Sequence, residues 1–408
     1  MGFPLHPFEV APGSFDAGKY RWAISDAELE RRWGLVRAEM KREKIDCLII
    51  QNDNRYRAGM LRYFTDIGCL SNPVTVLFPV NEGMTLFANG GGYSPPQTPP
   101  YACRGVRDLI GVPVFPTYNA AVNSPDADAV VEIVKKRGYR KIGVVRPNSM
   151  LGLFYQKILT GLKDLEIVDF TEFVDVIKAV KSPEELMYVQ KAATTQDYVA
   201  EAIPSFLKPG KFEYEIRHQI CQLLGDLGSE EQLIMIGSAP AGERAGHKAH
   251  FFQNRRIEKG DQVFIMIEPN GPGGYWAELG RTYVLGTPPK ELLAVWDDAV
   301  KAEMYTASLL RPGVTAAEVY HKYDEFIKNM GYASETRIFA HGQGYDLMER
   351  PGIRPDETMV IQSDMNIAIH PTLAKGGGYA FACDNFISGP DGGRRIHTLK
   401  QEIIPVDC

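Results

Sequence analysis

The chain has 408 residues, of which 44% are hydrophobic and 24% are charged, and its formal net charge at pH 7 is −6. A chain of this length usually divides into two domains, and this composition is typical of a globular protein. The small net charge argues against a nucleic-acid-binding protein, and no apolar stretch is long enough to cross a bilayer. We therefore expect no nucleic-acid partner and no membrane partner.

The cysteines and the first residues bear on the cellular compartment. The six cysteines stand far apart, without the spacing of a disulfide framework or a metal knuckle. The first ten residues, MGFPLHPFEV, lack the basic start and the apolar core of a signal peptide. We expect a cytoplasmic protein whose cysteines are reduced.

The first part of the chain alternates between predicted strands and helices. Ser25 is expected to cap a helix, because acids follow it in the first turn and apolar residues recur along the segment. Another helix is expected over residues 151–162. Short apolar runs predict strands over residues 47–50, 75–80, 84–89, 141–145 and 166–170. The alternation favours an α/β domain, which we place at residues 1–178.

A second domain is expected to begin at residue 179. The sequence Ser182-Pro183-Glu184-Glu185 has the features of a helix start, with Ser as the cap, Pro in the first position and acids in the first turn. A long helix follows. The second domain then spans residues 179–408.

Two apolar strands of the second domain carry acids. Residues 263–267 form a predicted strand that ends in Glu268, and a Gly- and Pro-rich loop leads to a second strand that contains Glu278 and Arg281. A carboxylate in an apolar strand costs free energy unless it is paired, protonated or bound to a ligand. This pair of strands is therefore the first candidate for a functional site, and we expect Arg281 to be an ion-pair partner of the acids.

The helices of the second domain repeat along the sequence. A Pro-Gly pair, a glutamate near a helix start and a glycine at the helix end recur after 103 residues. The first set is Pro209-Gly210, Glu215 and Gly228, and the second is Pro312-Gly313, Glu318 and Gly331. A repeat of this kind indicates two copies of one structural unit.

The strands repeat in the same order. IMIEP (265–269) recurs as IAIHP (367–371), and GGYWAE (273–278) recurs as GGYAFACD (377–384). The second domain is therefore expected to have two similar α-β halves around a pseudo-twofold axis. A site between the halves would be lined by matched positions, which are Glu268 with His370, and Glu278 with Cys383 or Asp384.

Motifs along nearly the whole chain resemble the creatinase/aminopeptidase P superfamily. The matching stretches are KSPEELMYVQKAA, LRPGVTAAEVYHKY, GDQVFIMIEP, GGYWAELGRTYVLG, HGQGYDLMERP and MNIAIHP. The resemblance implies an α/β N-terminal domain followed by an α+β C-terminal domain of the pita-bread fold, with two pseudo-symmetric α-β halves. It also implies a homodimer.

The residues at the superfamily's metal positions differ from those of its metallopeptidases. Those enzymes hold two divalent ions with two Asp, one His and two Glu. The corresponding positions here are Glu268 or Met266, then Glu278, His341, His370 and Cys383. Glu268 and Met266 face the same side of one strand, so the sequence does not decide which of the two occupies the metal position. A pair of hard ions needs bridging carboxylates at set lengths, and a dimetal peptidase is therefore not expected.

The favoured interpretation is an enzyme similar to creatinase, which works without metal. His250 would be the general acid and base, because an imidazole titrates near neutral pH, and His247 is its rival. Glu268 and Glu278 would bind and polarise the substrate, while His341 and His370 orient it. The expected reaction is hydrolysis of a non-peptide C–N bond in a small polar molecule, with no cofactor.

Further residues are predicted to contact the substrate. Creatinase places an arginine after the turn that HGQG resembles, which implicates Arg350 or Arg354 as the partner of a substrate carboxylate. Ile67 lies in the segment that, in the family, reaches across a dimer to the partner's pocket. Tyr275, Cys383 and Asp384 are the remaining predicted substrate contacts.

Two alternatives remain. In the first, Glu278, His341, His370 and Cys383 hold a single Zn²⁺ or Fe²⁺ ion in a hydrolase or lyase, since all four are acceptable ligand types for a four-coordinate site. In the second, the chain is a catalytically inactive binding protein with the same fold. The sequence does not identify the substrate in any of these cases.

Overall fold

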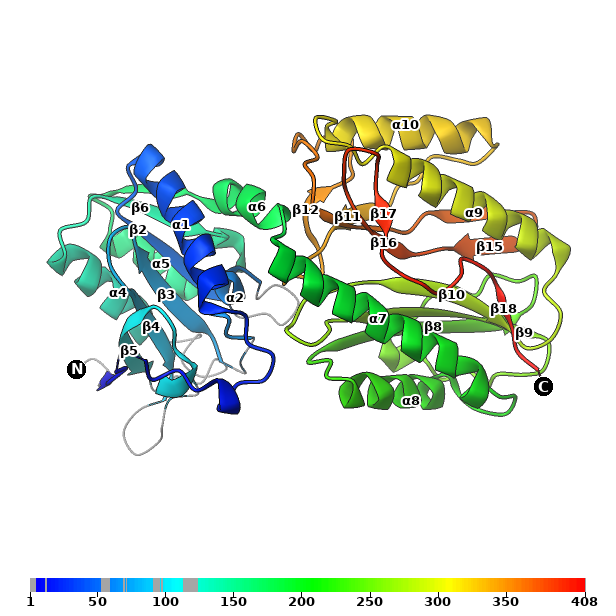
Figure 1. Cartoon of the computed structure of the whole chain (residues 1–408), viewed down its shortest axis with the longest axis horizontal. Helices are drawn as coiled ribbons and strands as arrows, with labels where there is room; N and C mark the ends of the chain where they lie inside the picture. The colour runs from blue at the N-terminus through cyan, green and yellow to red at the C-terminus, as the bar shows by residue number, and fades with distance from the viewer. Residues whose placement is uncertain are drawn as a thin grey trace. The chain divides into compact units, whose positions relative to one another are not determined.

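The computed structural model describes residues 5–11, 13–52, 59–68, 70, 72–90, 96, 98–112 and 124–407. The chain forms two compact units, Met1–Lys178 and Ala179–Cys408, which Figure 1 shows in blue to green and in green to red. Within the described ranges, no helix is both long and apolar enough to cross a membrane.

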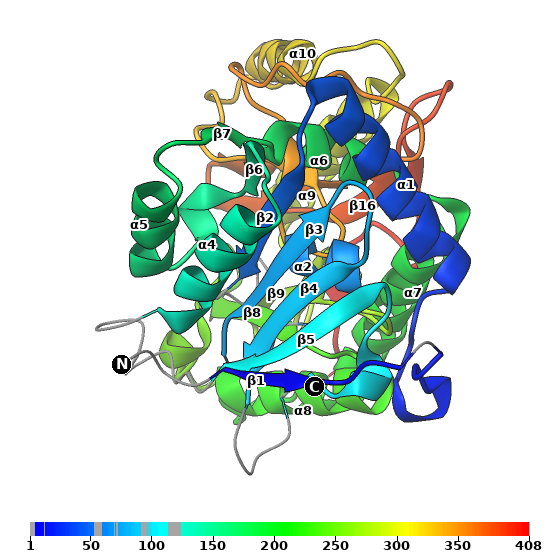
Figure 2. The same ribbon diagram turned by 90° about the vertical axis from the view of Figure 1, so that its left-hand side faces the viewer.

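The first unit is built on one seven-stranded sheet with the strand order β1-β5-β4-β3-β2-β6-β7. Its strands are β1 (His6–Phe8), β2 (Cys47–Asn52), β3 (Val74–Pro79), β4 (Met84–Asn89), β5 (Val106–Val112), β6 (Lys141–Val145) and β7 (Glu166–Asp169). Its helices are α1 (Asp26–Glu43), α2 (Gly59–Thr65), α4 (Pro125–Lys136), α5 (Gly152–Gly161) and α6 (Thr171–Ala179). Figure 2 shows α4 and α5 on one face of the sheet and α1 on the other.

The apolar runs of the sequence explain the sheet of the first unit. Strands β2, β3 and β6 are almost fully buried, and the side chains of Ile49, Leu77 and Val144 form a core with Val130 of α4 and Phe154 of α5. The Ser25 side chain accepts a hydrogen bond from the amide of Glu28, which confirms the predicted cap of α1. Strand β5 and helix α4 were not predicted.

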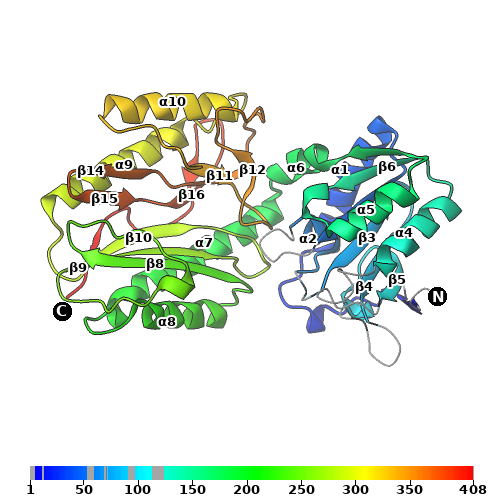
Figure 3. The ribbon, with the colours of Figure 1, turned by 180° about the vertical axis from the view of Figure 1, so that it is seen from behind.

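The second unit contains two sheets with helices on their outer faces. A four-stranded sheet has the order β18-β10-β9-β8, a five-stranded sheet has the order β12-β11-β13-β16-β17, and β14 pairs with β15. Figures 1 and 3 show α7 and α8 beside the first sheet, and α9 and α10 beside the second. This arrangement of two α-β halves confirms the predicted fold class.

The elements of the second unit follow in chain order. Its helices are α7 (Pro183–Phe206), α8 (Glu213–Asp226), α9 (Lys290–Ser308) and α10 (Ala316–Asn329). Its longer strands are β8 (Gln232–Pro240), β9 (Asp261–Pro269) and β10 (Leu279–Val284). The shorter ones are β11 (Ala340–Gly342), β12 (Glu349–Gly352), β13 (Asn366–Ile369), β14 (Thr372–Lys375), β15 (Gly378–Phe381), β16 (Asp384–Ile387), β17 (Arg394–Arg395) and β18 (Ile404–Pro405).

The repeated sequence produces the same local structure twice. Gly210 and Gly313 precede α8 and α10 with φ angles of 92° and 93°, a conformation that glycine adopts without strain. At both helix starts a glutamate, Glu215 or Glu318, accepts a hydrogen bond from the backbone amide three residues earlier. The capping of the two helices is therefore duplicated along with the sequence.

The two halves of the second unit touch through Gly280 of β10 and Cys383, which precedes β16. The amide of Gly280 donates to the carbonyl of Cys383 at 3.0 Å. A Cβ atom on Gly280 would lie 2.9 Å from Cβ of Cys383 and 3.2 Å from Sδ of Met266. This approach requires glycine, and it brings the ends of strands from both halves to one place.

Candidate metal centre

Three buried side chains from both halves of the second unit meet at the strand ends. Glu278 stands directly before β10, His341 lies on β11, and His370 follows β13. His341 Nε2 is 3.2 Å from Glu278 Oε1, and His370 Nε2 is 3.8 Å from Glu278 Oε2. One ligand atom from each residue lies within 4.8 Å of the other two. These three side chains are called the Glu-His-His cluster below.

The strands set the positions of the two imidazoles. His341 pairs with Ala368 of β13, and His370 comes directly after the last residue of that strand. The backbone amide of His370 donates to the carbonyl of Phe339 at 2.7 Å, which ties the end of β13 to the approach to β11. The two rings are therefore neighbours, with centroids 5.2 Å apart.

A network of side-chain amides holds Glu278 in place. Gln343 Nε2 donates to Glu278 Oε1 at 2.6 Å, and the backbone amide of Glu278 donates to Asn385 Oδ1 at 2.6 Å. Asn385 Nδ2 in turn donates to Gln343 Oε1 at 2.8 Å and to Asn366 Oδ1 at 2.9 Å. Sequence reasoning did not identify these three amides. Asn385 and Asn366 could have been found from the alternation of side chains along a strand. Asn385 lies two residues after Cys383 and Asn366 lies four residues before His370, so each faces the same side as a predicted site residue.

The charges of the cluster support one another. Burial alone would raise the pKa of Glu278, but the charge of His341 and a hydrogen bond from it hold this pKa below its ordinary value. Burial would lower the pKa of His341, and the charge of Glu278 raises it above its ordinary value instead. For His370, burial prevails over the charge of Glu278 and lowers the pKa to about 3. Without an ion, the cluster combines a carboxylate with one imidazole whose pKa is raised and one whose pKa is lowered.

A second acid, Glu268, stands near the end of β9 close to the cluster. Burial, followed by the charge of Glu278, raises the pKa of Glu268 well above its ordinary value. Met266, two residues earlier, packs instead with Phe264, Phe381 and Cys383 in an apolar group. Of the two residues that the open register left as candidates, Glu268 is therefore the one that interacts electrostatically with Glu278.

Cys383 lies next to the cluster. Its Sγ donates to Glu278 Oε2 at 3.6 Å, and the side chain is fully buried. Burial, followed by the charge of Glu278, raises the pKa of this thiol well above its ordinary value. Among the described residues, Glu278, His341 and His370 have ligand atoms close enough together to hold one ion. The thiol of Cys383 is not part of this group.

The donor set fits one divalent ion. A carboxylate and two imidazoles are a common set of three protein ligands for a catalytic zinc ion, with a further position left open. His370 Nδ1 is also buried and has no hydrogen-bond partner among the described residues, so this imidazole is not fixed at both nitrogens. A pair of ions would need bridging carboxylates, and among the described residues the cluster itself contains only Glu278.

The structure separates the two histidines that sequence analysis proposed as the base. His250 lies in the short helix His250–Phe252, is exposed, and packs its ring on Phe251 with centroids 3.8 Å apart. The ring of His247 contacts Phe381 at 5.5 Å, and Phe381 stacks on His370 at 5.5 Å. His247 is therefore one aromatic ring away from the cluster. The role of His250 stays a prediction that its surroundings do not support.

The arginines predicted to bind a substrate carboxylate already have acidic partners. Arg350 binds both carboxylate oxygens of Glu357, at 3.0 and 2.6 Å. Arg354 binds both oxygens of Asp356, at 2.8 and 2.9 Å. Substrate binding by either arginine would require breaking a two-point ion pair.

The other predicted substrate contacts are part of the fold. The hydroxyl of Tyr275 donates to Glu185 at 2.7 Å. Asp384 is fully buried between Arg281 and Arg395, at 2.9 and 2.8 Å, which agrees with the expected ion-pair role of Arg281. Ile67 is buried in the first unit. As substrate-binding residues, these side chains remain predictions.

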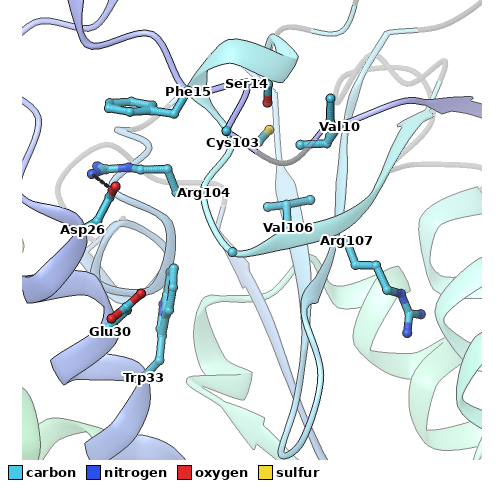
Figure 4. Close-up of a pocket in the computed structure, with 13 residues that line it drawn as sticks. Val10, Ser14, Phe15, Asp26, Glu30, Trp33, Cys103, Arg104, Val106 and Arg107 are labelled. Atoms are coloured by element: carbon cyan, nitrogen blue, oxygen red, sulfur yellow. Dashed lines mark hydrogen bonds and ion pairs between the residues drawn. The ribbon is translucent and has the colours of Figure 1, made fainter.

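A pocket of about 490 Å³ in the first unit is a separate feature (Figure 4). Arg104 at its edge pairs with Asp26 and Asp66. Burial raises the pKa of the neighbouring Cys103 thiol to about 12, so this thiol is a poor nucleophile near neutral pH. The thiol and the guanidinium that line the pocket are therefore a poor nucleophile and an already paired charge.

Comparisons with known proteins identify relatives of the chain. A sequence model described as metallopeptidase family M24 matches residues 188–398. The probable dipeptidase PepE of Mycobacterium tuberculosis is 26% identical over 239 residues, which are 58% of this chain and 63% of that protein, so the match spans less than two thirds of PepE. The Xaa-Pro dipeptidase of Pyrococcus furiosus is 25% identical over 280 residues, or 68% of this chain and 78% of that protein.

Solved structures share the fold along most of the chain. The X-Pro aminopeptidase from Thermotoga maritima superposes with a TM-score of 0.76 and 18% identity, over 93% of this chain and 99% of that one. The prolidase from Pyrococcus horikoshii superposes with a TM-score of 0.73 and 19% identity, over 92% of this chain and 100% of that one. At these identities the likeness supports the predicted fold.

These findings correct the functional interpretation of the sequence. A metal-free, creatinase-like enzyme without a cofactor is wrong, because the matching family is one of metallopeptidases and Glu278, His341 and His370 form a potential metal site. Hydrolysis of a non-peptide C–N bond is also contradicted, because the relatives are dipeptidases. The same relatives do not favour a catalytically inactive protein. The prediction failed because it treated the substituted ligands as a loss of metal binding.

Proposed function

The chain belongs to metallopeptidase family M24, and from this membership we propose that it is a metal-dependent hydrolase that cleaves the peptide bond of a short peptide. The observation that carries the proposal is the Glu-His-His cluster, in which ligand atoms of Glu278, His341 and His370 lie within 4.8 Å of one another. Xaa-Pro dipeptides are the first substrates to test, because relatives of the chain carry that name.

The cluster would hold one divalent ion. When bound, the ion supplies a Lewis acid that polarises the carbonyl of the bond to be cleaved. The second α-β half of the domain contributes the two imidazoles, and the first half contributes the carboxylate. The ion would therefore have ligands from both halves. Gln343 and Asn385 keep Glu278 oriented toward this position through the amide network.

Glu268 is the proposed proton carrier. Its raised pKa leaves the carboxyl group protonated at a higher pH than an exposed glutamate, so it can give a proton to the nitrogen of the leaving amine. A leaving amine without a proton is a poor leaving group, and an acid close to the polarised carbonyl lowers that barrier. Glu278 and Glu268 then have different roles, because His341 and His370 lower the pKa of the first while burial raises the pKa of the second.

The proposal is tested by metal analysis and peptide hydrolysis on the full chain. We expect about one divalent ion per chain, hydrolysis of an Xaa-Pro dipeptide such as Ala-Pro, loss of this activity in chelator and its return when metal is added. His370→Ala should lose both metal and activity. His250→Ala is the matched control, because this histidine is exposed outside the cluster, and it should retain both. Metal-free protein that hydrolyses peptides in chelator would contradict the proposal.

The assembly of the protein is a separate question. The homodimer and the cytoplasmic location remain predictions from the sequence. Light scattering of the purified chain tests the first, because a dimer has twice the mass of the 45.5 kDa chain.

A further inference from the structure

The pocket of the first unit lies between the start of α1, the segment around Phe15 and the entry to β5 (Figure 4). Its volume of about 490 Å³ is within the range of small-molecule sites, which is about 300–1,000 Å³. Its walls include the aromatic side chains of Phe15 and Trp33 and the carboxylates of Asp26 and Glu30. The described residues that line it all belong to the first unit, whereas the Glu-His-His cluster belongs to the second.

The ring of Trp33 forms a fixed wall of this pocket. Its Nε1 donates to the backbone carbonyl of Phe64 at 2.7 Å, which sets the orientation of the indole. Gly105 lies against the edge of the ring with a φ angle of 64°, and a Cβ atom there would stand 2.4 Å from Cη2 of Trp33. This close contact requires glycine. Among aromatic side chains, an indole is the best partner for a cation that lies over its face.

Two carboxylates stand on the same side of α1 as this ring. Asp26, Glu30 and Trp33 follow one another at spacings of four and three residues, so they share one face of the helix. Figure 4 shows the carboxylate of Glu30 beside the indole. Glu30 forms no ion pair or side-chain hydrogen bond with any described residue, and the side chain of Asp26 is 74% exposed. Both acids can therefore meet a cation that enters from solvent.

Arg104 lines the pocket without making it a site for an anion. Its Nη2 donates to Asp66 at 2.5 Å, and its Nη1 is 3.1 Å from Asp26. The ring of Phe15 covers the guanidinium, with 4.3 Å from its centroid to the guanidinium carbon. Nε of Arg104 has no hydrogen-bond partner among the described residues, but this atom is buried, so a ligand in the pocket does not reach it.

Arg107 is also occupied by acids of its own. Its guanidinium pairs with Asp108 at 2.8 Å and with Glu82. Figure 4 shows it directed away from the other labelled side chains. Since the buried carboxylate of Asp66 offsets Arg104 in the same way, Asp26 and Glu30 leave the pocket with an excess of negative charge.

We propose that this pocket binds a small organic cation, in which an amidinium, guanidinium or ammonium group adjoins a flat or apolar part. The charged group lies between the carboxylates of Asp26 and Glu30, and the rest of the molecule lies over the indole of Trp33. Ion pairing and cation–π attraction then act on the same ligand. The inference does not depend on the proposed peptidase function, because the residues that carry it belong to the first unit.

Calorimetry on the full chain tests the charge of the ligand. The probes are benzamidine, a flat cation, and benzamide, its neutral counterpart of nearly the same shape. We expect the wild type to bind benzamidine at least about 5-fold more tightly than benzamide, because only the cation gains from the carboxylates and from the indole face. This preference should shrink as the ionic strength rises, since the two acids are exposed to solvent.

Two variants assign the binding to this pocket. Glu30→Lys replaces attraction by repulsion at an exposed position, and it should weaken benzamidine binding by about 10-fold or more with little change for benzamide. Trp33→Leu removes the aromatic face and should weaken it by about 3- to 10-fold. Because Trp33 also bonds to Phe64, thermal unfolding is measured alongside, and Glu30→Lys decides the outcome if Trp33→Leu does not fold.

Glu39→Lys is the matched control, because Glu39 lies on α1 outside the lining and pairs with Arg42. It should bind benzamidine as the wild type does. Equal affinity of the wild type for benzamidine and benzamide, or unchanged benzamidine binding by Glu30→Lys, would overturn the inference. An equal loss in Glu39→Lys and Glu30→Lys would also overturn it, because it would show a general effect of charge.

A tripeptide distinguishes two sources of the same chemistry. Capped Gly-Arg-Gly presents a guanidinium as part of a chain, whereas benzamidine presents an amidinium on a free molecule. We expect the tripeptide to bind more weakly than benzamidine, because a pocket of this volume admits the side chain but not the flanking backbone. Tighter binding of the tripeptide would overturn the assignment to a small molecule. Peptide hydrolysis by Glu30→Lys should equal that of the wild type in either case.

Discussion

Gln343 Nε2 donates a hydrogen bond of 2.6 Å to Oε1 of Glu278, although the two residues are 65 positions apart in the sequence. Both side chains are buried, and Gln343 is itself held by Asn385. A neutral side-chain amide thus fixes the orientation of the proposed carboxylate ligand. An amide can fix a carboxylate in this way without competing for the ion, because its NH₂ group carries no charge that would repel the ion.

Replacing Gln343 by Leu is expected to weaken metal binding by about 10- to 100-fold, because an unsupported carboxylate loses its orientation. A competition titration with a chromophoric chelator measures the affinity. Gln219→Leu, on α8 and in contact with Lys211, is the control and should bind metal as the wild type does. Equal affinities in the two variants would show that Gln343 does not position the ligand.

Cys383→Ser tests whether the thiol is a metal ligand. Because the residues that share one ion position are Glu278, His341 and His370, we expect this variant to keep about one ion per chain. Cobalt-substituted wild type should likewise lack thiolate-to-metal charge-transfer absorption. Such absorption in the wild type, together with its loss in Cys383→Ser, would place sulfur in the coordination shell.

Asp384→Asn is expected to destabilise the second unit by about 3 to 5 kcal/mol, because it leaves the buried charge of Arg281 without its acidic partner. Denaturant unfolding measures the change in the free energy of unfolding. Asp356→Asn breaks the exposed pair with Arg354 and should have a far smaller effect, since exposed ion pairs contribute little. Similar losses in both variants would contradict the structural role of Asp384.

Asp197 should make stability depend on pH. Burial alone would raise the pKa of Asp197, but hydrogen bonds from His397 and Thr398 lower it below its ordinary value. Since the folded-state pKa is depressed, the stabilisation is present above the unfolded-state pKa of about 4 and is lost as the pH falls through the folded-state value.

Unfolding of the wild type and Asp197→Asn at several pH values checks this dependence. We expect the free energies of unfolding to differ at pH 7 and to converge in acid. A difference that stays constant down to the lowest pH at which both variants fold would show that the charge of Asp197 does not stabilise the protein. Asp364→Asn, at a loop position outside this contact, should show no such convergence.

The sequence predicts those parts of the structure that depend on local patterns. The Ser182 cap is confirmed by reciprocal hydrogen bonds with Glu185, and the repeated Pro-Gly helix starts are present at Gly210 and Gly313. The match between IMIEP and IAIHP also pointed to His370, which stands in the cluster. Helix caps and strand periods act over a few residues, so they can be recognised without the fold.

The features that sequence reasoning missed depend on distant partners. Arg350 and Arg354 follow the HGQG turn in the sequence, and only the fold shows that each is already paired with an acid. His247 and His250 lie three positions apart, yet one packs against Phe381 and the other is exposed. The choice of a metal-free enzyme failed for a different reason, because the sequence placed Glu278, His341 and His370 in one site but the substituted ligands were interpreted as a loss of metal binding.

The close approach of Gly280 and Cys383 has a consequence for how an ion would be captured. Because backbone atoms of the two halves are hydrogen-bonded beside Glu278, the carboxylate from one half and the imidazoles from the other stand at fixed separations before an ion arrives. Metal binding then requires no free energy to bring the ligands together. Metal-free and metal-loaded crystals should therefore have the same backbone here, and exchange of one ion for another should proceed without any unfolding.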